Sequence, residues 1–180
     1  MAAICVFCAS STRLEPRWLD LAWQLGKAIA ERGHELVSGG GSVGMMGALA
    51  EGARAGGGHT VGVIPQSLVD LEVADHDADE LVVTDGMAAR KIVMIERADA
   101  FLTLPGGLGT LDELFEVWTT ATLGLHIKPL VLLDTDGFYA GLVDWLKGLV
   151  GQGFVRPEGF DLLYVAQRVD EALDVVERFG

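Results

Sequence analysis

Short apolar runs separated by segments of helical pattern constrain this chain more than any other feature. Pro16 suits a first helical turn and Gly33 a helix end, and an apolar stripe that includes Trp18, Leu25 and Ile29 lies between them. Strand, helix and strand in alternation predict an α/β fold, an open parallel sheet with helices on both faces and therefore three layers. The runs do not alternate with polar residues, so we interpret them as buried strands, at Ile4–Phe7, Glu35–Val37, Thr60–Ile64, Leu81–Val83, Ala100–Leu104 and Pro129–Leu133.

Length and composition predict one globular domain over residues 1–180. The chain has 180 residues, of which 50% are hydrophobic and 22% charged, and no linker divides it. Further helices are expected at Leu142–Val150 and Val169–Phe179. No run approaches the roughly 20 apolar residues of a membrane span, and the first residues lack the basic flank and long apolar core of a signal peptide. We therefore expect a cytoplasmic protein that binds no membrane.

The charge balance argues against nucleic acid as a partner. The formal net charge is -13, which repels polyanions over most of the surface, although backbone amides and a few cations can still bind a small phosphate ester. Cys5 and Cys8 have CxxC spacing, but strand alternation directs them to opposite faces, so we interpret them as buried thiols. The histidines are scattered, and no metal site is expected.

The first of two glycine-rich turns follows the second predicted strand. Gly39, Gly41 and Gly44 match GxGxxG between a strand and a helix, which is typical of dinucleotide binding. The next strand, "TVGVIP", lacks the acidic residue that would bind a nicotinamide ribose. Two interpretations stay open: a tight turn packed on the sheet, or a phosphate or ribose contact at Gly40 and Gly41.

The second turn, "LPGGLGTLDELFE", follows the fifth predicted strand. Its glycines at 106, 107 and 109 let a ligand approach the backbone. Thr110 is expected to cap the following helix or to bind a ligand oxygen, with Asp112 and Glu113 in the first helical turn. A capping box formed by Thr110 and Glu113 is the structural alternative, but it does not explain the glycines, so a ligand role is favoured.

Two further segments are candidates for the same site. The acidic connector from Pro65 to Glu80 is predicted to be a surface loop with a short helix, and a loop of this length is usually functional. Arg90 and Lys91 lie on a predicted helix that leads into the fifth strand. Neighbours on a helix point about 100° apart, so one of them is expected to face the site and the other to flank it.

The glycine turn carries a family resemblance. "LPGGLGTLDE" resembles the PGGxGTxxE signature of the Lonely Guy family, the cytokinin-activating phosphoribohydrolases, which have often been mislabelled as lysine decarboxylases. "ICVFCASS", "SGGGSVGMMG", "VIPQSLVDLE", "ELVVTDGMAARK" and "LGLHIKPLVLL" fall in the family's order, so the resemblance covers most of the chain. It implies a Rossmann-like fold, a homodimer, and hydrolysis of N6-modified adenosine monophosphates to free base and ribose 5-phosphate.

The resemblance also implies roles for individual residues. Arg90 and Glu113 would be the catalytic pair. Where the family commonly has His-Glu before the Arg-Lys pair, this chain has Ala88 and Ala89, so support from those side chains is absent. The implied substrate contacts are Glu72, Lys91, Gly107, Leu108, Gly109, Thr110, Leu111, Asp112 and Thr119.

The chemistry is consistent with these residue types. A carboxylate beside the sugar can stabilise an oxocarbenium-like state or activate water, and Glu113 is placed for this role. No cofactor is expected, because the lysines show no Schiff-base setting. The alternative function is a non-catalytic nucleotide or cofactor carrier on the same fold. A pure phosphate binder gains nothing from a carboxylate near its anion, so Glu113 favours the hydrolase. The helix that contains Phe115, Trp118 and Leu123 is apolar on more than one face, consistent with a homodimer.

Overall fold

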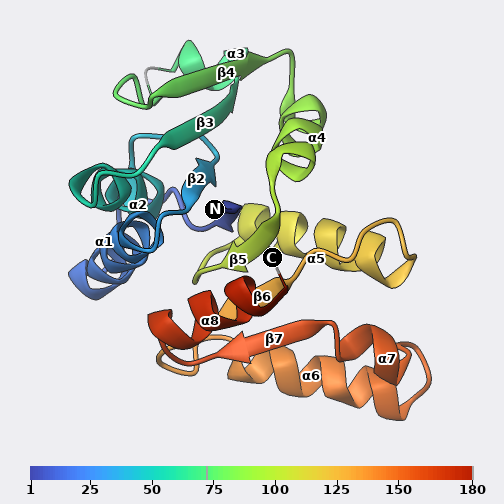
Figure 1. The fold of residues 1–180 in the computed structure, drawn as a ribbon. Helices are drawn as coiled ribbons and strands as arrows, with labels where there is room; N and C mark the ends of the chain where they lie inside the picture. Colours follow the sequence, from blue (N-terminus) through green and yellow to red (C-terminus); the bar gives the residue numbers. More distant parts are fainter. Residues whose placement is uncertain (72, 180) are drawn as a thin grey trace.

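The computed structural model describes residues 1–71 and 73–179. Its strands form one parallel sheet in the order β4-β3-β2-β1-β5-β6-β7 (Figure 1). The strands are β1 (Ala3–Phe7), β2 (Glu35–Ser38), β3 (Thr60–Pro65), β4 (Glu80–Thr84), β5 (Ala100–Thr103), β6 (Leu130–Leu133) and β7 (Leu163–Ala166). The helices are α1 (Pro16–Glu31), α2 (Gly44–Ala55), α3 (Gln66–Val69), α4 (Met87–Arg97), α5 (Leu108–Thr122), α6 (Ala140–Gly151), α7 (Pro157–Phe160) and α8 (Val169–Phe179).

The Rossmann-like α/β fold is confirmed. The six predicted strands correspond to β1 to β6, with ends that differ by no more than one residue. Strand β7 is absent from the prediction because it lies at the sheet edge, where Tyr164 and Val165 are not fully buried and the apolar run is short. The acidic connector contains the short helix α3, as predicted.

Helices cover both faces of the sheet and produce three layers. On one face, α1, α2 and α8 pack with core residues such as Ile4, Leu25 and Leu173. On the other face, α4, α5 and α6 contribute side chains such as Met94 and Val117. Cys8 belongs to the first core and Cys5 to the second, so the expected opposite orientation of these free thiols is confirmed.

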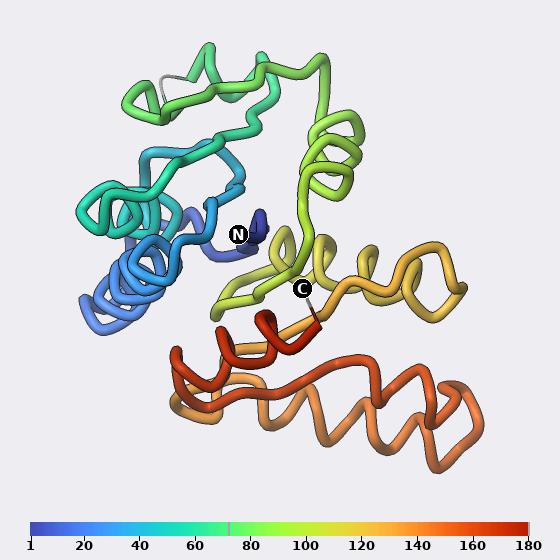
Figure 2. Tube along the Cα trace, viewed as in Figure 1, coloured from blue at the N-terminus to red at the C-terminus, as the bar shows by residue number. Residues whose placement is uncertain are grey.

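The chain path creates a crevice at one end of the sheet. From β1 the chain builds β2, β3 and β4 on one side, and α4 then carries it back to β5 on the other side (Figure 2). Strand β1 pairs with both β2 and β5. In open parallel sheets, ligands bind where the strand order reverses, outside the carboxyl ends of the strands. The carboxyl ends of β1 and β5 are therefore the expected place for a site.

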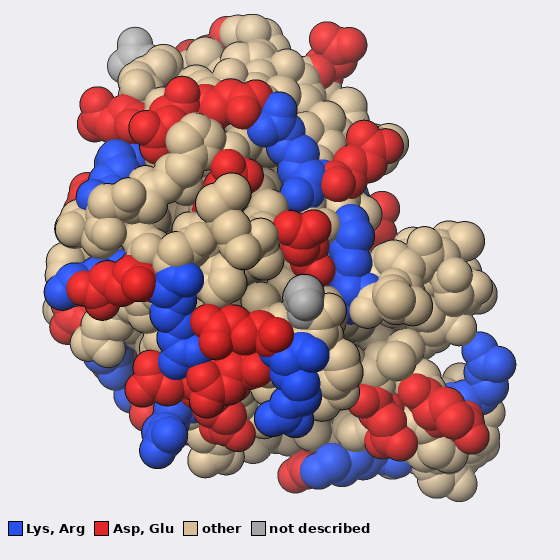
Figure 3. Space-filling model, in the orientation of Figure 1, with Lys and Arg blue, Asp and Glu red and all other residues tan. Residues whose placement is uncertain are grey.

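Acidic and basic side chains are intermixed on the face shown in Figure 3, which carries no broad basic patch. Among the described residues, no helix has the length and apolar character needed to cross a membrane.

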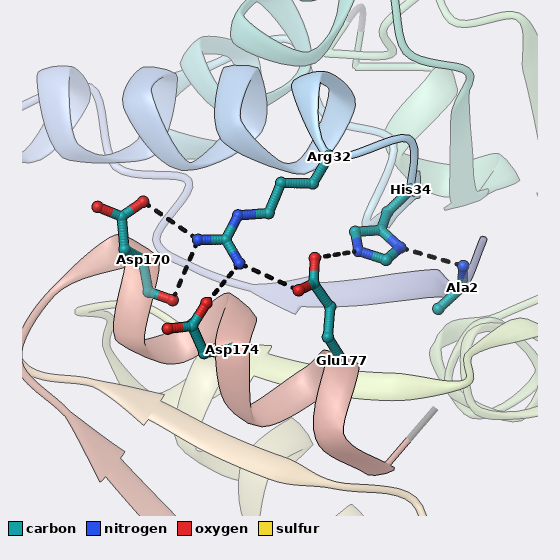
Figure 4. Close-up of polar contacts among 6 residues, drawn as sticks. All are labelled: Ala2, Arg32, His34, Asp170, Asp174 and Glu177. Carbon is teal, nitrogen blue, oxygen red and sulfur yellow. Dashed lines mark hydrogen bonds and ion pairs between the residues drawn. The ribbon is translucent and has the colours of Figure 1, made fainter.

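A charged cluster ties α8 to the end of α1 (Figure 4). Arg32 donates to Asp174 at 2.7 Å and to Glu177 and Asp170 at 3.3 Å. His34 accepts the amide of Ala2 at Nδ1, so its Nε2 carries the proton and donates to Glu177. The hydrogen bond from His34, followed by the effect of Arg32, lowers the pKa of Glu177. We call these residues the Arg32 cluster.

Candidate active site

A cleft of about 590 Å³ lies at the carboxyl ends of β1, β2, β3 and β5. Its volume falls within the range of about 300–1,000 Å³ that is common for small-molecule sites. One wall comes from α4 and the glycine turn that opens α5, and the other from the β2–α2 turn and the β3–β4 connector. The polar and glycine residues at its surface include Cys8, Ser10, Ser11, Gly39, Gly41, Arg90, Lys91, Gly107, Gly109, Thr110, Asp112 and Glu113.

Arg90 forms the floor of this cleft. It is 6% exposed, and it donates from Nε to the carbonyl of Val63 at 2.9 Å and from Nη2 to the carbonyl of Gly39 at 2.8 Å. Val63 belongs to β3, and Gly39 directly follows β2. The sheet itself therefore orients the guanidinium. Within residues 1–71 and 73–179, Arg90 forms no ion pair with a carboxylate. Its positive charge is therefore left for an anion in the cleft.

The first glycine turn is shaped by Arg90. A Cβ at Gly39 would lie 1.8 Å from Nη2 of Arg90, so any side chain here would displace the guanidinium. Gly40 has a φ of 68° and packs tightly on β3, which matches the interpretation of a tight turn. Gly41 lines the cleft and Gly40 does not. The structure thus places only one of these two candidates where a ligand could contact it.

The second glycine turn differs from the predicted cap. Helix α5 begins at Leu108, and Gly107 is its N-cap, with no side-chain hydrogen bond. The capping box of Thr110 and Glu113, which was the structural alternative to a ligand role, is therefore not formed, and the predicted placement of Asp112 and Glu113 in the first turn is wrong. A Cβ at Gly107 or Gly109 would meet nothing within 4 Å, so the space beside the start of the helix is open at both positions.

The early start of α5 exposes backbone amides to the cleft. The first amide with a partner is that of Leu111, which donates to the carbonyl of Gly107 at 3.0 Å. The preceding amides of the first turn have no partner within the helix, and they carry the positive end of its dipole. Gly106 has a different role, since a Cβ there would lie 2.1 Å from the hydroxyl of buried Thr110. The turn can therefore bind an anion through about three amides.

Glu113 faces the cleft one turn further along α5. Its side chain is half-buried, and within the described ranges its carboxylate accepts no hydrogen bond and forms no ion pair. Burial raises its pKa to about 7, against the opposing effect of Arg90. Burial also raises the pKa of the Cys8 thiol well above its ordinary value, which keeps that cleft residue neutral. Glu113 can thus exchange protons near neutral pH.

Lys91 lies between α4 and α5. Its Nζ is 2.9 Å from Oδ2 of Asp112 and 2.5 Å from Oε2 of Glu116. These contacts, first that with Glu116 and then that with Asp112, raise the pKa of Lys91. A Schiff-base lysine needs a lowered pKa, so this environment is opposite to the one such chemistry requires.

An apolar wall faces the charged one. It consists of side chains from α2, β3, α3 and the β3–β4 connector: Met46, Ile64, Leu68, Leu71 and Val73. The connector is held over the first glycine turn by a bridge between Gly41 and Ala74 and by hydrogen bonds from Ser42 to the carbonyl of Val73. Arg54 fixes it further through a 2.7 Å ion pair with buried Asp75.

Some predicted contacts do not reach this cleft. Thr119 is exposed and lines a separate hollow of about 250 Å³ on the far side of α5, with Phe115 and Trp118. It lies nine residues beyond Thr110, or about 13 Å along the helix. Leu111 packs toward the core beneath α5, and its amide is already bonded. Glu72 lies outside the described residues.

Sequence reasoning missed further residues in and beside the cleft. Glu116, which contacts Lys91 without lining the cleft, was not singled out, although it lies four residues beyond Asp112 and therefore on the same helix face. Met46 and Met87 were also missed, and Met87 Sδ lies 3.8 Å from Arg90 Nη1. Apolar side chains of this kind carry no signal that distinguishes a ligand wall from the core. No group of three or more His, Cys, Asp or Glu within residues 1–71 and 73–179 could hold a metal ion.

Known proteins resemble this chain over nearly its whole length. Residues 46–176 match a family model described as "Possible lysine decarboxylase". A cytokinin riboside 5'-monophosphate phosphoribohydrolase of Mycobacterium tuberculosis is 54% identical over 170 residues, which cover 94% of this chain and 90% of that protein. One from Arabidopsis thaliana is 42% identical over 176 residues, which cover 98% and 81%. Among solved structures, the molybdenum cofactor carrier protein of Chlamydomonas reinhardtii superimposes with a TM-score of 0.76 at 26% identity, covering 99% of this chain and 97% of that one.

Proposed function

We propose that this chain, which belongs to the Lonely Guy family of cytokinin riboside 5'-monophosphate phosphoribohydrolases, hydrolyses the N-glycosidic bond of N6-modified adenosine 5'-monophosphates. Its membership rests on relatives at 42–54% identity that are named as phosphoribohydrolases. The observation that carries the reaction is that Glu113, with its raised pKa, and the buried Arg90 line the same cleft.

The phosphate end of the substrate would lie at the glycine turn. The free amides of the first turn of α5, between Gly107 and Leu111, carry partial positive charge toward the cleft. Thr110 and Lys91 line the same end and can add a hydroxyl and a cation. The open space at Gly107 and Gly109 lets phosphate oxygens approach the backbone closely.

The ribose carbon would lie beside Glu113. When the bond from C1' to the base nitrogen breaks, positive charge develops on the sugar, and an ionised carboxylate stabilises it. Glu113 can also take a proton from the attacking water, whose oxygen bonds to C1' as the bond to the base breaks, and the departing base then receives a proton from Glu113 or from solvent. The products are the free base and ribose 5-phosphate.

Arg90 would act through its fixed charge. A guanidinium stays protonated in proteins, so it cannot serve as an acid that gives up its proton. Its Nε and one Nη2 hydrogen are committed to backbone carbonyls and one Nη1 hydrogen faces the sulfur of Met87, which leaves two N–H donors for the substrate. It would orient the nucleotide and offset the negative charge of the departing base.

The base would lie against the apolar wall. Leu68, Leu71 and Val73 come from the connector that covers the cleft, and an apolar N6 substituent would remove their surfaces from water. Adenosine monophosphate lacks this group. One methylene in an apolar pocket is worth about 10–200-fold in discrimination, so we propose that plain adenosine monophosphate is the poorer substrate.

We also propose that the enzyme acts as a cytoplasmic homodimer. Leu123, Leu125 and Ile127 after α5 are exposed, at 67%, 71% and 98%, and a second copy would cover them. Free thiols at Cys5 and Cys8 suit a reducing compartment. Sedimentation at micromolar concentration tests the dimer, and a monomer there would contradict it.

The test of the function is a release assay. Isopentenyladenosine monophosphate, adenosine monophosphate and the unphosphorylated isopentenyl riboside are incubated with the protein, and free base is measured. We expect release from the monophosphates only, and faster release from the N6-modified one. Binding of the nucleotides without any release would instead support the non-catalytic carrier, the alternative suggested by the structural neighbour.

A further inference from the structure

The environment of Lys91 contains two carboxylates with different properties. Asp112 and Glu116 lie four residues apart on α5, and both contact Nζ of Lys91. The side chain of Asp112 is 61% exposed and lines the cleft. Glu116 does not line the cleft, and its Oε2 is buried from solvent with Lys91 as its ionic partner. Asp112 is thus the more open of the two, whereas Glu116, with a side chain that is 36% exposed, contacts Lys91 through an oxygen that is buried.

The exchangeable carboxylate lies next to the predicted phosphate position. Asp112 is three residues beyond Gly109, within one helical turn of the free amides of α5. A phosphate bound at those amides would bring a third anion to Lys91, beside Asp112 and Glu116. Anions at one lysine repel one another, so binding favours rotation of the most exposed of the side chains, that of Asp112, into solvent.

We propose that Asp112 occupies the place of the substrate's phosphate at Lys91 in the unliganded protein, and that Glu116 is a positioning residue that keeps Lys91 at the cleft during the exchange. This inference deepens the proposed function and rests on it. The phosphate must displace Asp112 to bind Lys91, whereas the enclosed contact with Glu116 persists in both states.

The exchange gives a physical basis for selecting a 5'-monophosphate over a riboside. A phosphate dianion competes with Asp112 for the lysine because both are anions. The neutral 5'-hydroxyl of a riboside cannot compete, so Lys91 stays with Asp112 and contributes nothing to its binding. Exposed ion pairs are worth little, so the competition is expected to weaken phosphate affinity by about two- to fivefold.

Neutralising Asp112 and neutralising Glu116 are therefore expected to change the affinity for phosphate in opposite directions. Asp112→Asn frees Lys91 and should lower the dissociation constant for ribose 5-phosphate about two- to fivefold. Glu116→Gln leaves Lys91 mobile and bound only to Asp112, and it should raise that constant several-fold because the lysine must be ordered on binding. Glu116→Asp keeps the charge and should recover part of the affinity.

Calorimetric titration of ribose 5-phosphate into the full chain tests this inference. Asp144→Asn is the matched control, because Asp144 is also an exposed partner of a lysine, Lys147, but lies on α6 outside the cleft. Opposite shifts in the Asp112 and Glu116 variants, with none in the control, support the proposal. If both variants tighten binding, the carboxylates act only through their general field, and the positioning role is overturned.

Failure of the inference can be told apart from failure of the proposed function. Base release that proceeds in the wild type while Asp112→Asn and Glu116→Gln leave phosphate affinity unchanged overturns the exchange alone. Opposite affinity shifts without any base release overturn the hydrolase and leave the exchange intact. Thermal melting of each variant shows whether the folded state is retained.

Discussion

Arg32 and Arg90 are both held by several hydrogen bonds, but their partners differ in charge. Arg32 lies at the surface, where Asp170, Asp174 and Glu177 neutralise it (Figure 4). Arg90 is buried, and its hydrogen-bond partners are neutral carbonyls and a sulfur atom. Arg32 is therefore fully ion-paired. Among the described residues of the cleft, Arg90 has no ion pair with a carboxylate, and the carboxylate of Glu113 accepts no hydrogen bond.

This difference distinguishes the Arg32 cluster, whose charges stabilise the fold, from the charges of the cleft, which are placed to act on a ligand. A buried charge without a counter-charge lowers stability, so a fold keeps one mainly where a ligand completes it. The Arg32 cluster joins two helices and needs nothing further. We therefore expect substitutions in the cleft to change the rate of base release more than the free energy of unfolding. Substitutions in the Arg32 cluster should change the free energy of unfolding more than the rate.

Replacement of the cleft carboxylate is expected to give the largest effect. Glu113→Gln removes the group that would stabilise charge on the sugar, and kcat should fall about 100- to 1000-fold. The assay is base release from isopentenyladenosine monophosphate. Glu96→Gln, an exposed change on α4 outside the cleft, is the control and should keep full activity. A Glu113→Gln protein as fast as the wild type would refute the catalytic assignment.

Arg90→Lys is the next test. The ammonium is a point charge and cannot reproduce both carbonyl contacts of the guanidinium, so kcat/KM should fall about 100-fold. Unsatisfied carbonyls should also lower the free energy of unfolding by about 1–3 kcal/mol in denaturant titration. Arg32→Lys is the matched change in the Arg32 cluster, and we expect it to leave base release intact. Equal loss of activity in both proteins would remove the distinction between the two arginines.

The pH dependence should identify the working form of Glu113. If the ionised carboxylate stabilises the sugar or activates water, kcat/KM rises as the pH passes through about 7 and then levels off. A profile that falls through the same range would instead indicate a general acid. The residual rate of Glu113→Gln should lack this transition, which assigns it to Glu113 rather than to another group.

Glu113 should also lower stability at alkaline pH. Its folded pKa of about 7 exceeds the ordinary value of 4.5, so the folded state binds the proton more tightly than the unfolded state. Stability is therefore lost as the pH rises between these values. At pH 8 we expect Glu113→Gln to melt a few degrees higher than the wild type, and near pH 4 the difference should vanish. A lower melting temperature at pH 8 would contradict this reasoning.

The smallest effect is expected in the Arg32 cluster. The folded pKa of Glu177 is lowered, so its contribution is present above the unfolded value and is lost as the pH falls through the folded one. Because the side chain is 43% exposed, Glu177→Gln should cost less than about 1 kcal/mol in urea unfolding at pH 7. The cost should disappear in acid, and base release at pH 7 should not change.

The sequence was most informative where local pattern decides structure. The apolar runs predict β1 to β6, but β7 has a half-exposed edge pattern that resembles a loop. The start of α5 was misplaced, because Thr110 is a good capping residue and glycines impose no preference of their own. Glu116 and the apolar wall depend on which helix faces pack together. The packing of helix faces is a property of the tertiary structure, and the spacing of residues along the chain does not reveal it.

The close approach of Gly39 to Arg90 links two distant positions in the chain. With 1.8 Å between a Cβ at 39 and Nη2, a side chain at the first position and the buried guanidinium at the second exclude each other. In evolution the two residues should therefore change together. A related sequence in which Arg90 is replaced no longer requires glycine at position 39. A sequence that acquires a side chain at position 39 while it keeps Arg90 displaces the guanidinium from the floor of the cleft.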